Sequence, residues 1–508
     1  MEFNVGKMLM NRANLFGNKE GFVRDNIRLS FSDFNESANT IAHFLVEQGF
    51  VKGDKLAIIC KNNEDFAAVF FAAAKIGVIT VAINYKLQPK EVAFVVNHCY
   101  AKGVMYGDDH LKLVAAIKAL VFVELYFTND SAGEDTLVAN IISSYGKQEP
   151  TYRSSGDDPI LIMYTSGTTG EPKGAMLSHN NLISSAITLS SSISWWETDR
   201  YLHMVPLFHI AGFTPLITNV HTGATTVFLE NFEPIQAWQV MEREKITTMM
   251  SMPEMLVSLI KAIDLMKPDF STIRTITCGT STVPQQIIHV FKQFGIPVQQ
   301  VYGLTEFTGG LTIWRSEFDE QKYDSKGKLV MYSEIKVVSL ETGEALQPHE
   351  DGEILCRGPQ TFLGYFKDEE STKNALVDGW YHTGDIGHVD EEGFLYLVDR
   401  MKDIIVHNGE KIYSAEVENL LVSHFAVAQA AVIGVPRPDY GEIPIAYIVL
   451  AEGKVVTAAE LIQYCKNELA AYKVVREIIF IEHLPRNAVG KILKDELRKQ
   501  SRNAVQSK

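Results

Sequence analysis

Short apolar runs alternate along most of the chain with segments whose apolar residues recur at helical spacing. Residues 55–60 (KLAIIC) predict a strand, 64–77 a helix and 78–83 (VITVAI) a second strand. The same order of strand, helix and strand recurs within 225–251 and within 272–303. Because parallel strands are joined by helical crossovers, this alternation predicts parallel sheets. Ligands of such sheets bind beyond the carboxyl ends of the strands.

The pattern changes in the last third of the chain. From about residue 329, short apolar runs separated by Gly, Asp and Glu predict a small antiparallel β region. After Arg400 the pattern is compact α+β, with helices expected at 414–424 and 457–469 and strands at 427–435, 443–450 and 476–482. We therefore predict an α/β protein with a large N-terminal domain (1–399) of parallel α/β subdomains plus a small β region. A short hinge (400–402) would join it to a small α+β domain (403–508).

Length and charge narrow the class of protein. A chain of 508 residues is too long for one hydrophobic core, so two or more domains are expected. The net charge of −15 argues against a general nucleic-acid binder, because phosphate backbones demand clustered Lys and Arg. Residues 403–508 carry as many basic as acidic side chains, so the whole net charge belongs to residues 1–402. This asymmetry supports a domain boundary near residue 400.

The cysteines and the apolar segments favour a cytoplasmic protein. The five cysteines are scattered and none forms a CxxC pair, which fits neither a zinc site nor a disulfide framework and suits a reducing compartment. The N-terminus lacks the uninterrupted apolar stretch of a signal peptide. Lys75 and Gly77 interrupt the most apolar stretch, 67–83, which therefore predicts a buried helix running into a strand rather than a membrane span.

A loop rich in Gly, Ser and Thr follows the apolar run 160–164. Its sequence, TSGTTGEPKG (165–174), offers many backbone N–H groups and hydroxyls, which together suit phosphate oxygens, and Lys173 adds a positive charge. It is not a Walker A loop, because that motif ends in Gly-Lys-Ser/Thr whereas Lys173 lies between Pro172 and Gly174. From these residues alone, a surface turn of small residues remains the alternative.

Six segments in order resemble the motifs of adenylate-forming enzymes, the superfamily of acyl-CoA synthetases, luciferases and peptide-synthetase adenylation domains. They cover most of the chain and comprise YTSGTTGEPKGAMLSH (164–179), PLFHIAG (206–212), YGLTE (302–306), GWYHTGDIG (379–387), YLVDRMKDIIVHNGEKIYSAEVE (396–418) and PRNAVGKILKDEL (485–497). The second half of the chain is most similar to bacterial fatty-acyl-CoA synthetases. Six ordered matches are far more specific than a single loop.

The resemblance implies a two-step reaction with ATP, Mg²⁺ and CoA. A carboxylic acid attacks the α-phosphate of ATP, pyrophosphate leaves, and the CoA thiol then displaces AMP from the acyl-adenylate. Residues 1–399 would form the AMP-binding (adenylation) domain and 403–508 a mobile lid. The implied nucleotide- and pyrophosphate-binding residues are Thr165, Ser166, Gly167, Thr168, Thr169, Gly170, Lys173, Gly279, Thr280, Tyr302, Gly303, Thr305, Asp385 and Arg400. Among these, Tyr302 would stack on adenine and Asp385 would accept hydrogen bonds from the ribose hydroxyls.

The resemblance also assigns catalytic, metal-binding and hinge residues. Lys491 would bridge the carboxylate of the acid and the α-phosphate, while Glu306, helped by Thr165, would bind Mg²⁺. Lys402 would be the hinge residue about which the lid swings, and Gly409 would let the backbone approach the CoA thiol in the second step. Taken alone, Lys491 would more often be a solvated charge and Glu306 a residue at a helix N-terminus, and the alternative for Lys402 is a plain linker charge.

The acyl pocket is implied to include Phe208, Ser251 and Gly309, with His209 bordering the carboxylate. For His209 a core histidine without a catalytic role is the alternative. No basic residue falls among the loops expected to line the pocket, which disfavours an acid with a second anionic group. The apolar lining suits a medium- or long-chain fatty acid, or alternatively an aryl acid such as a coumarate.

The sequence favours free CoA as acceptor, because no carrier-protein segment with its Ser attachment site is apparent. An enzyme that loads a separate carrier protein and a non-catalytic nucleotide sensor are the further alternatives. The expected partners are small molecules and not nucleic acid. The sequence leaves open whether the chain forms a homodimer and whether it contacts a membrane peripherally.

Overall fold

The computed structural model describes residues 4–129, 135–165, 172–281, 283–437, 441–486 and 490–506. The chain forms two compact units. Unit 1 comprises Met1–Ile335 and Cys356–Tyr381, and unit 2 comprises Lys336–Leu355 and His382–Lys508. The chain thus passes between the units several times, whereas the predicted domains would be joined by a single crossing at residues 400–402. The domain boundary at the hinge therefore stays a prediction.

A nine-stranded sheet forms one half of unit 1, with the order β16-β15-β14-β13-β12-β10-β11-β1-β2 among the described residues. The strands from β14 to β1 run parallel, and β2, β15 and β16 are antiparallel additions at the edges. The bounds are β1 Glu20–Arg24, β2 Ile27–Ser30, β10 Arg200–His203, β11 Thr225–Phe228, β12 Thr248–Ser251, β13 Thr275–Gly279, β14 Val298–Leu304, β15 Gly309–Trp314 and β16 Lys328–Leu329.

An eight-stranded sheet forms the other half of unit 1, with the order β19-β9-β8-β4-β3-β5-β6-β7. It is parallel from β8 to β7, while β9 is antiparallel to β8 and β19 is antiparallel to β9. The bounds are β3 Lys55–Ile59, β4 Ile79–Ala82, β5 Ala101–Tyr106, β6 Leu125–Thr128, β7 Thr136–Leu137, β8 Pro159–Thr165, β9 Lys173–Ser178 and β19 Gly364–Tyr365. The two sheets confirm the predicted parallel α/β architecture.

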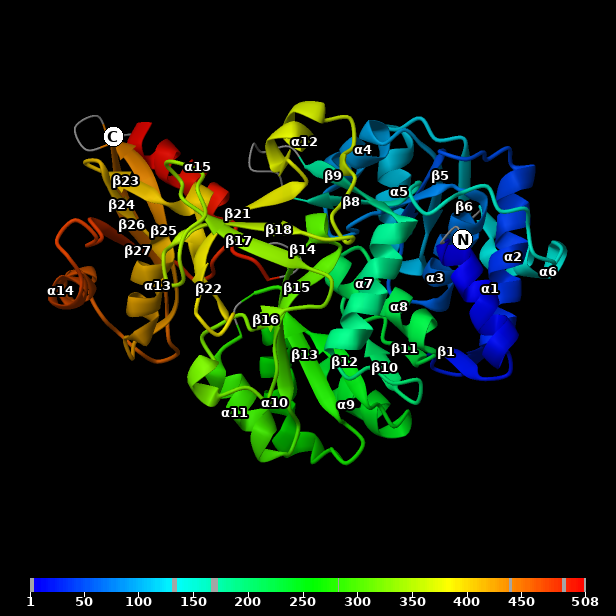
Figure 1. Ribbon diagram of the computed structural model, residues 1–508, viewed down its shortest axis with the longest axis horizontal. Helices are drawn as coiled ribbons and strands as arrows, with labels where there is room; N and C mark the ends of the chain where they lie inside the picture. Colours follow the sequence, from blue (N-terminus) through cyan, green and yellow to red (C-terminus); the bar gives the residue numbers. More distant parts are fainter. Residues whose placement is uncertain are drawn as a thin grey trace. The chain divides into compact units, whose positions relative to one another are not determined.

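Helices fill the space between these sheets and cover their outer faces (Figure 1). Helix α3 contacts β4 of one sheet and β1 of the other, and α7 contacts both β9 and β15. Helices α4 and α5 pack on β3, β4 and β5, and α9, α10 and α11 pack beside one another. The bounds are α1 Val5–Phe16, α2 Phe31–Glu47, α3 Glu64–Ile76, α4 Pro89–His98, η1 Asp108–His110, α5 Leu111–Lys118, α6 Val138–Ser144, α7 His179–Ser192, α8 Ile210–Thr222, α9 Pro234–Arg243, α10 Pro253–Met266, α11 Gln285–Gln293, η2 Thr305–Phe307, η3 Glu320–Lys322 and α12 Glu369–Ala375.

The apolar stretch at 67–83 is a buried helix followed by a strand, as predicted. Helix α3 begins at the N-cap Asn63, whose side chain accepts from the Phe66 N–H, and ends at Gly77, which has φ 78°. A left-handed C-cap of this kind suits Gly because it has no Cβ. Lys75 is fully buried, and its ammonium binds Asn35, Asn39 and Glu149 at 2.6–2.8 Å, which compensates its lost hydration. None of the described helices is long and apolar enough to cross a membrane.

A five-stranded sheet forms the predicted small β region. Its order is β17-β18-β21-β20, with β22 paired to β21, and both β20 and β22 are antiparallel to β21. The bounds are β17 Glu334–Val338, β18 Gly352–Arg357, β20 Leu376–Val377, β21 Trp380–Val389 and β22 Leu395–Arg400. The divisions between the units fall within β17, β18 and β21.

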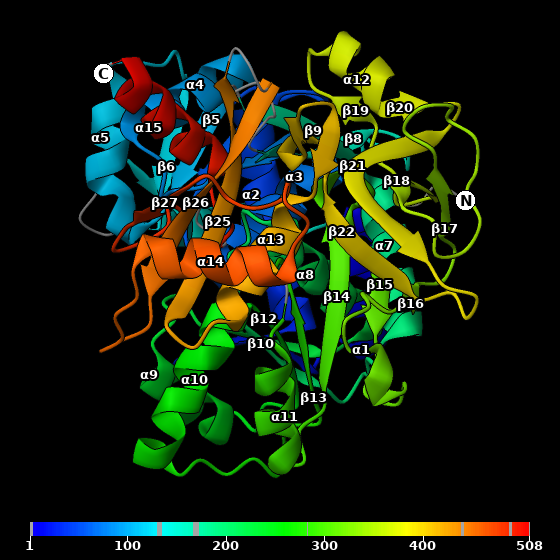
Figure 2. The ribbon, with the colours of Figure 1, turned by 90° about the vertical axis from the view of Figure 1, so that its left-hand side faces the viewer.

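The last sheet lies in unit 2, with the order β24-β23-β26-β25 and β27 parallel to β26. Helices α13 and α14 pack on one face of it and α15 on the other, and Figure 2 shows α14 across the strands. The bounds are η4 Met401–Asp403, β23 Ile405–His407, β24 Glu410–Ile412, α13 Ser414–Ser423, β25 Val427–Arg437, β26 Gly441–Leu450, α14 Ala458–Glu468, β27 Glu477–Phe480 and α15 Lys494–Gln506.

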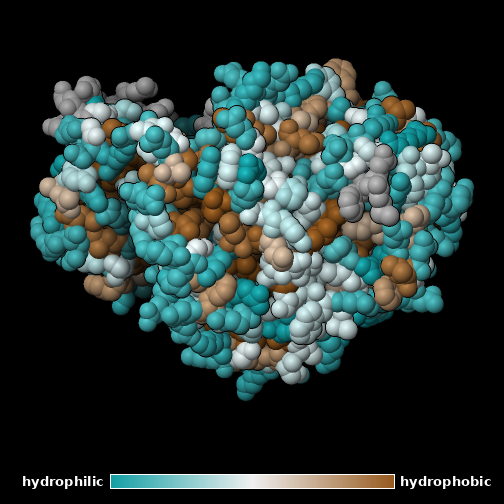
Figure 3. All heavy atoms as spheres, in the orientation of Figure 1, coloured by the Kyte–Doolittle hydropathy of each residue, from teal (hydrophilic) through white to brown (hydrophobic). Residues whose placement is uncertain are grey.

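On the face that Figure 3 shows, hydrophobic atoms form small groups among hydrophilic ones.

Candidate active site

The predicted phosphate loop lies between two paired strands of unit 1. Thr165 is the last residue of β8 and Lys173 is the first of β9, and the two are partners in the antiparallel ladder. The remaining predicted residues of this loop (Ser166, Gly167, Thr168, Thr169 and Gly170) lie outside the described residues. The structure therefore gives the two ends of the loop.

The Lys173 ammonium is held by the segment that begins helix α12. Its Nζ lies 2.5 Å from Ser371 Oγ, 3.7 Å from Asp368 Oδ2 and 5.5 Å from the centre of the Tyr365 ring. Asp368 also caps α12 by accepting the Ser371 N–H at 2.9 Å. The cation is thus placed by neutral and acidic groups from a segment about 200 residues away in sequence.

Glu306 lies in the short helix η2, directly after β14. Its Oε1 accepts a hydrogen bond from the Tyr365 hydroxyl at 3.0 Å, and its backbone carbonyl accepts the Phe362 N–H at 2.9 Å. Burial, followed by the negative charge of Glu306, raises the pKa of Tyr365 well above its ordinary value, so the phenol stays protonated and donates. The carboxylate is therefore held in one orientation by a neutral donor.

Several predicted residues lie at the ends of neighbouring parallel strands in the nine-stranded sheet. Ser251 ends β12 beside Cys278, and Gly279 ends β13 beside Val301. A Cβ on Gly279 would lie 2.6 Å from the carbonyl oxygen of Val301, so this strand end tolerates only glycine without a shift. Thr280 follows with φ 74°, a backbone conformation that a β-branched residue rarely adopts.

The Tyr-Gly-Leu-Thr stretch occupies the end of β14. Tyr302 pairs with Thr312 on β15, and Gly303 lies opposite Gly310, with Thr305 starting η2. A Cβ on Gly303 would lie only 2.0 Å from the Gly309 carbonyl oxygen. Two glycine-containing strands therefore approach one another here more closely than side chains would permit.

Phe208 and His209 precede helix α8 in an aromatic setting. The Phe208 ring lies 4.5 Å from the His209 ring and packs edge-on against Tyr85 at 5.0 Å, and Tyr85 stacks on His110 at 4.6 Å. Burial, with a smaller contribution from the positive charge of Lys86, lowers the pKa of His209 to about 3. The imidazole is therefore neutral near pH 7, and its buried Nε2 has no hydrogen-bond partner among the described residues.

In unit 2, Asp385 and Arg400 face one another across neighbouring strands. They are partners in the β21–β22 ladder, and Arg400 Nε lies 3.1 Å from Asp385 Oδ1. Asp385 is only 3% exposed, so its carboxylate is placed in a poorly hydrated setting beside a guanidinium. The two residues were predicted from separate motifs, and the structure brings them together.

Lys402 and Lys491 also lie in unit 2. Lys402 is in η4, with its Nζ 3.4 Å from Asp495 Oδ2. Burial, followed by the positive charges of Arg400 and Lys402, lowers the pKa of Lys491 to about 8, while Asp385 and Asp403 act in the opposite direction. The predicted lysine thus shares one electrostatic environment with three other predicted residues.

Gly409 lies in the two-residue turn between β23 and β24. It has φ 84° and Asn408 has φ 52°, which is the Asn-Gly combination that tight hairpins favour. A Cβ built on Gly409 would meet no atom within 4 Å, so nothing crowds the exposed side of this turn.

Several residues around these groups were not predicted. Tyr365, Asp368 and Ser371 belong to a stretch between recognised motifs, and Tyr85 and Lys86 follow β4, far from the other residues in sequence. The stretch Gly-Tyr-Phe at 364–366 has no residue spacing that points to a ligand. Among the described residues, no group of three or more His, Cys, Asp or Glu side chains could hold a metal ion.

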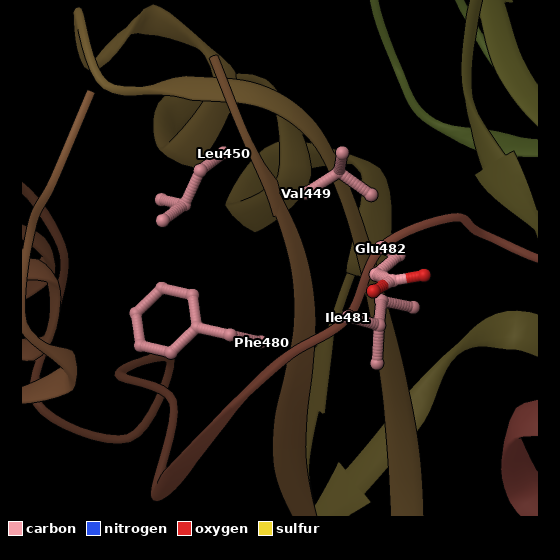
Figure 4. Close-up of a pocket in the computed structure, with 5 residues that line it drawn as sticks. All are labelled: Val449, Leu450, Phe480, Ile481 and Glu482. Carbon is pink, nitrogen blue, oxygen red and sulfur yellow. The ribbon is translucent and has the colours of Figure 1, made fainter. Parts of the chain in front are cut away.

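A pocket in unit 2 lies away from the predicted site residues. Figure 4 shows its lining, which comes from the ends of β26 and β27 and the residues that follow, namely Val449, Leu450, Phe480, Ile481 and Glu482. None of the residues predicted for nucleotide, acid or CoA binding lines it. We assign it no role in the reaction.

Comparison with known proteins gives the family. The profile of the AMP-binding enzymes matches residues 9–366, and that of the AMP-binding enzyme C-terminal domain matches residues 416–491. The long-chain-fatty-acid–CoA ligase FadD13 of Mycobacterium tuberculosis is 34% identical, with 98% of each chain covered. The feruloyl-CoA synthase of an Amycolatopsis species is 30% identical, covering 98% of this chain and 99% of its own.

A solved structure shares the whole fold. The O-succinylbenzoate coenzyme A synthetase MenE from Bacillus subtilis, in complex with ATP and magnesium ion, has a TM-score of 0.86 at 32% identity, covering 97% of this chain and 99% of its own. The parallel sheets define an α/β protein, and the two matched profiles place it among AMP-binding enzymes. The chain belongs to the AMP-binding enzymes of the adenylate-forming superfamily, as the motifs predicted, and is an AMP-forming acid–thiol ligase.

Proposed function

We propose that this ligase activates a medium- or long-chain fatty acid with ATP and Mg²⁺ and transfers the acyl group to CoA. The observation that carries the choice of acid is the setting of Phe208 and His209, in which the Phe208 ring contacts both the Tyr85 ring and an imidazole that is neutral near pH 7. These rings suit an alkyl chain because they offer apolar surface. The similarity to a long-chain-fatty-acid–CoA ligase over 98% of both chains supports the same acid class.

In the first step, residues of unit 1 would hold the phosphates. Thr165 and Lys173, at the two ends of the loop, would bind the β- and γ-phosphates and then pyrophosphate, with Ser166, Thr168 and Thr169 between them. Tyr302 would stack on adenine beside Gly279 and Thr280. These residues would place positive charge and hydrogen-bond donors beside the pyrophosphate, which becomes more negative as its bond to the α-phosphate breaks.

Glu306 and Thr165 fit a magnesium site that is completed by the nucleotide. Both offer hard oxygen donors, and the Glu306 carboxylate is already oriented by Tyr365. The described residues hold no cluster of three acidic or metal-ligating side chains, which agrees with a cation bound mainly by phosphate oxygens and water. When bound with ATP, magnesium would neutralise part of the negative charge of the phosphates.

Residues of unit 2 would complete each step. Asp385 would accept hydrogen bonds from the ribose hydroxyls, with Arg400 beside it, and the Lys491 ammonium would contact the carboxylate of the acid and the α-phosphate. Lys402 would act as the hinge residue within 400–402, about which the lid (403–508) swings. Gly409 would then admit the CoA thiol, because its turn carries no side chain on that side.

An aryl-acid CoA ligase is the second candidate. The positive charge of Lys86 acts on His209, so a basic side chain lies within electrostatic range of the predicted acyl site, although none was expected there. A cation near the pocket would favour acids that carry a second polar or anionic group. The similarity to a feruloyl-CoA synthase and to a succinylbenzoate ligase supports this alternative.

The decisive experiment is AMP release from Mg-ATP over a panel of acids, each assayed with and without CoA. The panel contains acetate, C6 to C18 fatty acids, benzoate, coumarate, succinylbenzoate and several amino acids. AMP release that peaks with C8 to C18 acids and rises strongly with CoA would support the proposal. A peak with aromatic acids would favour the second candidate, and acid-dependent pyrophosphate exchange without a CoA effect would instead indicate a carrier-protein acceptor.

We also propose a cytoplasmic location. None of the five cysteines forms a disulfide and all five are buried, which suits a compartment in which thiols stay reduced. Detecting the protein in separated cell fractions would test this location. Recovery in the secreted or cell-envelope fraction would contradict it.

A further inference from the structure

Residues 362–372, here called the connecting segment, contact both η2, which carries Glu306, and β9, which begins at Lys173. Its Phe362 N–H donates to the Glu306 carbonyl at 2.9 Å, at one end. Further along, the Phe366 N–H donates to the Gly174 carbonyl at 2.8 Å, next to Lys173. Strand β19, within the segment, pairs with β9 in the register Tyr365↔Ala175. One short stretch of backbone thus spans from the Glu306 turn to the Lys173 strand.

The Tyr365 side chain makes the contact to Glu306. Its hydroxyl donates to Glu306 Oε1 at 3.0 Å, and the Tyr381 side chain also acts on the pKa of this phenol. Tyr381 is only 5% exposed, and Phe362 packs edge-on against both rings, at 4.9 and 5.5 Å. The donor to the carboxylate is therefore fixed by the packing of these rings.

The same ring also lies beneath the Lys173 ammonium. The Nζ is 5.5 Å from the ring centre, which is within the range of a cation–π interaction. Ser371 and Asp368, from the end of the connecting segment, hold the same ammonium from another side. A single side chain, Tyr365, therefore faces both the proposed magnesium ligand and the proposed phosphate-binding cation.

We propose that Tyr365 is a positioning residue that sets the orientation of the Glu306 carboxylate and its spacing from the Lys173 ammonium before ATP binds. This inference rests on the proposed function, because it needs Glu306 to bind the cation that accompanies ATP. Residues that orient metal ligands through hydrogen bonds commonly change metal affinity or activity by about 10- to 100-fold when they are removed. The benefit of the arrangement is that both groups are in place before the phosphates arrive.

The test compares Tyr365→Phe with Tyr152→Phe. Tyr365→Phe keeps the ring beneath Lys173 and removes only the hydroxyl. Tyr152→Phe removes an equivalent phenol-to-glutamate hydrogen bond, since the Tyr152 hydroxyl donates to Glu149 Oε2 at 2.6 Å, within unit 1 but outside the proposed site. The two variants should lose similar stability, which thermal unfolding measures.

The experiment measures the dissociation constant of Mn²⁺ from the enzyme in the presence of ATP and without any acid. The free Mn²⁺ concentration is determined by electron paramagnetic resonance. We expect Tyr365→Phe to raise the dissociation constant by about tenfold or more, and Tyr152→Phe to leave it unchanged. The free Mg²⁺ needed for half-maximal pyrophosphate exchange should rise in parallel, with the KM for the acid unaffected. In a Glu306→Gln background, the same Tyr365→Phe change should have no further effect on Mn²⁺.

Equal Mn²⁺ affinity in Tyr365→Phe and Tyr152→Phe would overturn the inference while leaving the proposed function intact. Wild-type enzyme that binds no Mn²⁺ with ATP and releases no AMP with any acid would overturn the proposed function, and the inference with it. Should Tyr365→Phe fail to fold, Tyr381→Phe provides a second test. This variant keeps the Tyr365 hydroxyl and removes only the Tyr381 hydroxyl beside it. It should then raise the dissociation constant by a smaller factor, about threefold, and an unchanged value would count against the inference.

Discussion

The Lys491 ammonium should lose its proton within the pH range in which the enzyme can be assayed. Burial, together with the charges of Arg400 and Lys402, lowers the pKa of Lys491 to about 8. If this cation bridges the carboxylate and the α-phosphate, only the protonated form supports adenylation. The first half-reaction should therefore be fast below pH 8 and should slow as the pH rises through that value.

The size of the effect follows from the pKa. With a pKa of about 8, the protonated fraction of Lys491 falls from about nine-tenths near pH 7 to about one-tenth near pH 9. The rate of acid-dependent pyrophosphate exchange, measured with ATP and acid below their KM values so that it reports the ionisation of the free enzyme, should thus fall by about tenfold over this range. The second half-reaction should not share this loss, because thiolate formation on CoA increases with pH.

Lys491→Arg is the matched control. A guanidinium stays protonated throughout this range, so the variant should show a lower but nearly flat exchange rate between pH 7 and 9. Wild-type exchange that is flat or rises over the same range would refute the assignment of the low pKa to a catalytic cation. The same fall in Lys491→Arg as in wild type would show that another group titrates.

Four further changes test separate parts of the site. Lys491→Ala should slow acyl-adenylate formation by about 10²- to 10³-fold and spare thioester formation from preformed acyl-adenylate; equal losses in the two separately assayed half-reactions would contradict its role. Gly303→Ala should lower the free energy of unfolding by about 1–3 kcal/mol in denaturant titrations, because its Cβ would lie 2.0 Å from the Gly309 carbonyl oxygen, and unchanged stability would count against that geometry. Asp385→Asn should raise the KM for ATP by about tenfold or more through weaker hydrogen bonds to ribose, whereas an unchanged KM would argue against ribose binding. His209→Phe should change the KM for the acid but not the shape of the pH profile above pH 6, because the pKa of His209 is about 3; a lost ionisation near neutral pH would contradict this.

Local pattern was enough to predict the main elements of the fold. The strand–helix–strand prediction for 55–83 corresponds to β3, α3 and β4, and the helices predicted at 414–424 and 457–469 correspond to α13 and α14. These segments are recognisable because their hydrophobic period follows from burial on one face. The order of strands was not predictable in the same way. Strand β1 pairs with β11 some 200 residues later, and such a pairing leaves no trace in either segment.

The short elements of unit 2 were also missed. The hairpin of β23 and β24 has three residues in each strand, too few for a recognisable alternation. Helix α15 carries mostly charged or polar residues, so its apolar stripe is sparse, although Leu497 is fully buried in the core. Its contacts with the sheet include the packing of Leu497 and a hydrogen bond between Ser501 and Tyr447, which form no repeating pattern.

For the candidate site, motifs supplied the residues and the structure supplied their neighbours. Asp385 and Arg400 come from different motifs, and only the β21–β22 register shows that they form an ion pair. The contact from Tyr365 to Glu306 spans 59 residues and that from Lys173 to Ser371 spans 198. Contacts of this length arise from the tertiary fold, so no local spacing could have predicted them.

The most direct test of the central claim is to identify the products of ATP in single turnover with a C16 fatty acid. In the absence of CoA, we expect pyrophosphate and an enzyme-bound acyl-adenylate detectable by mass spectrometry. Addition of CoA should then convert the acyl-adenylate into AMP and acyl-CoA in equal amounts. Formation of ADP and phosphate instead, or acyl-CoA without any acyl-adenylate, would contradict the account.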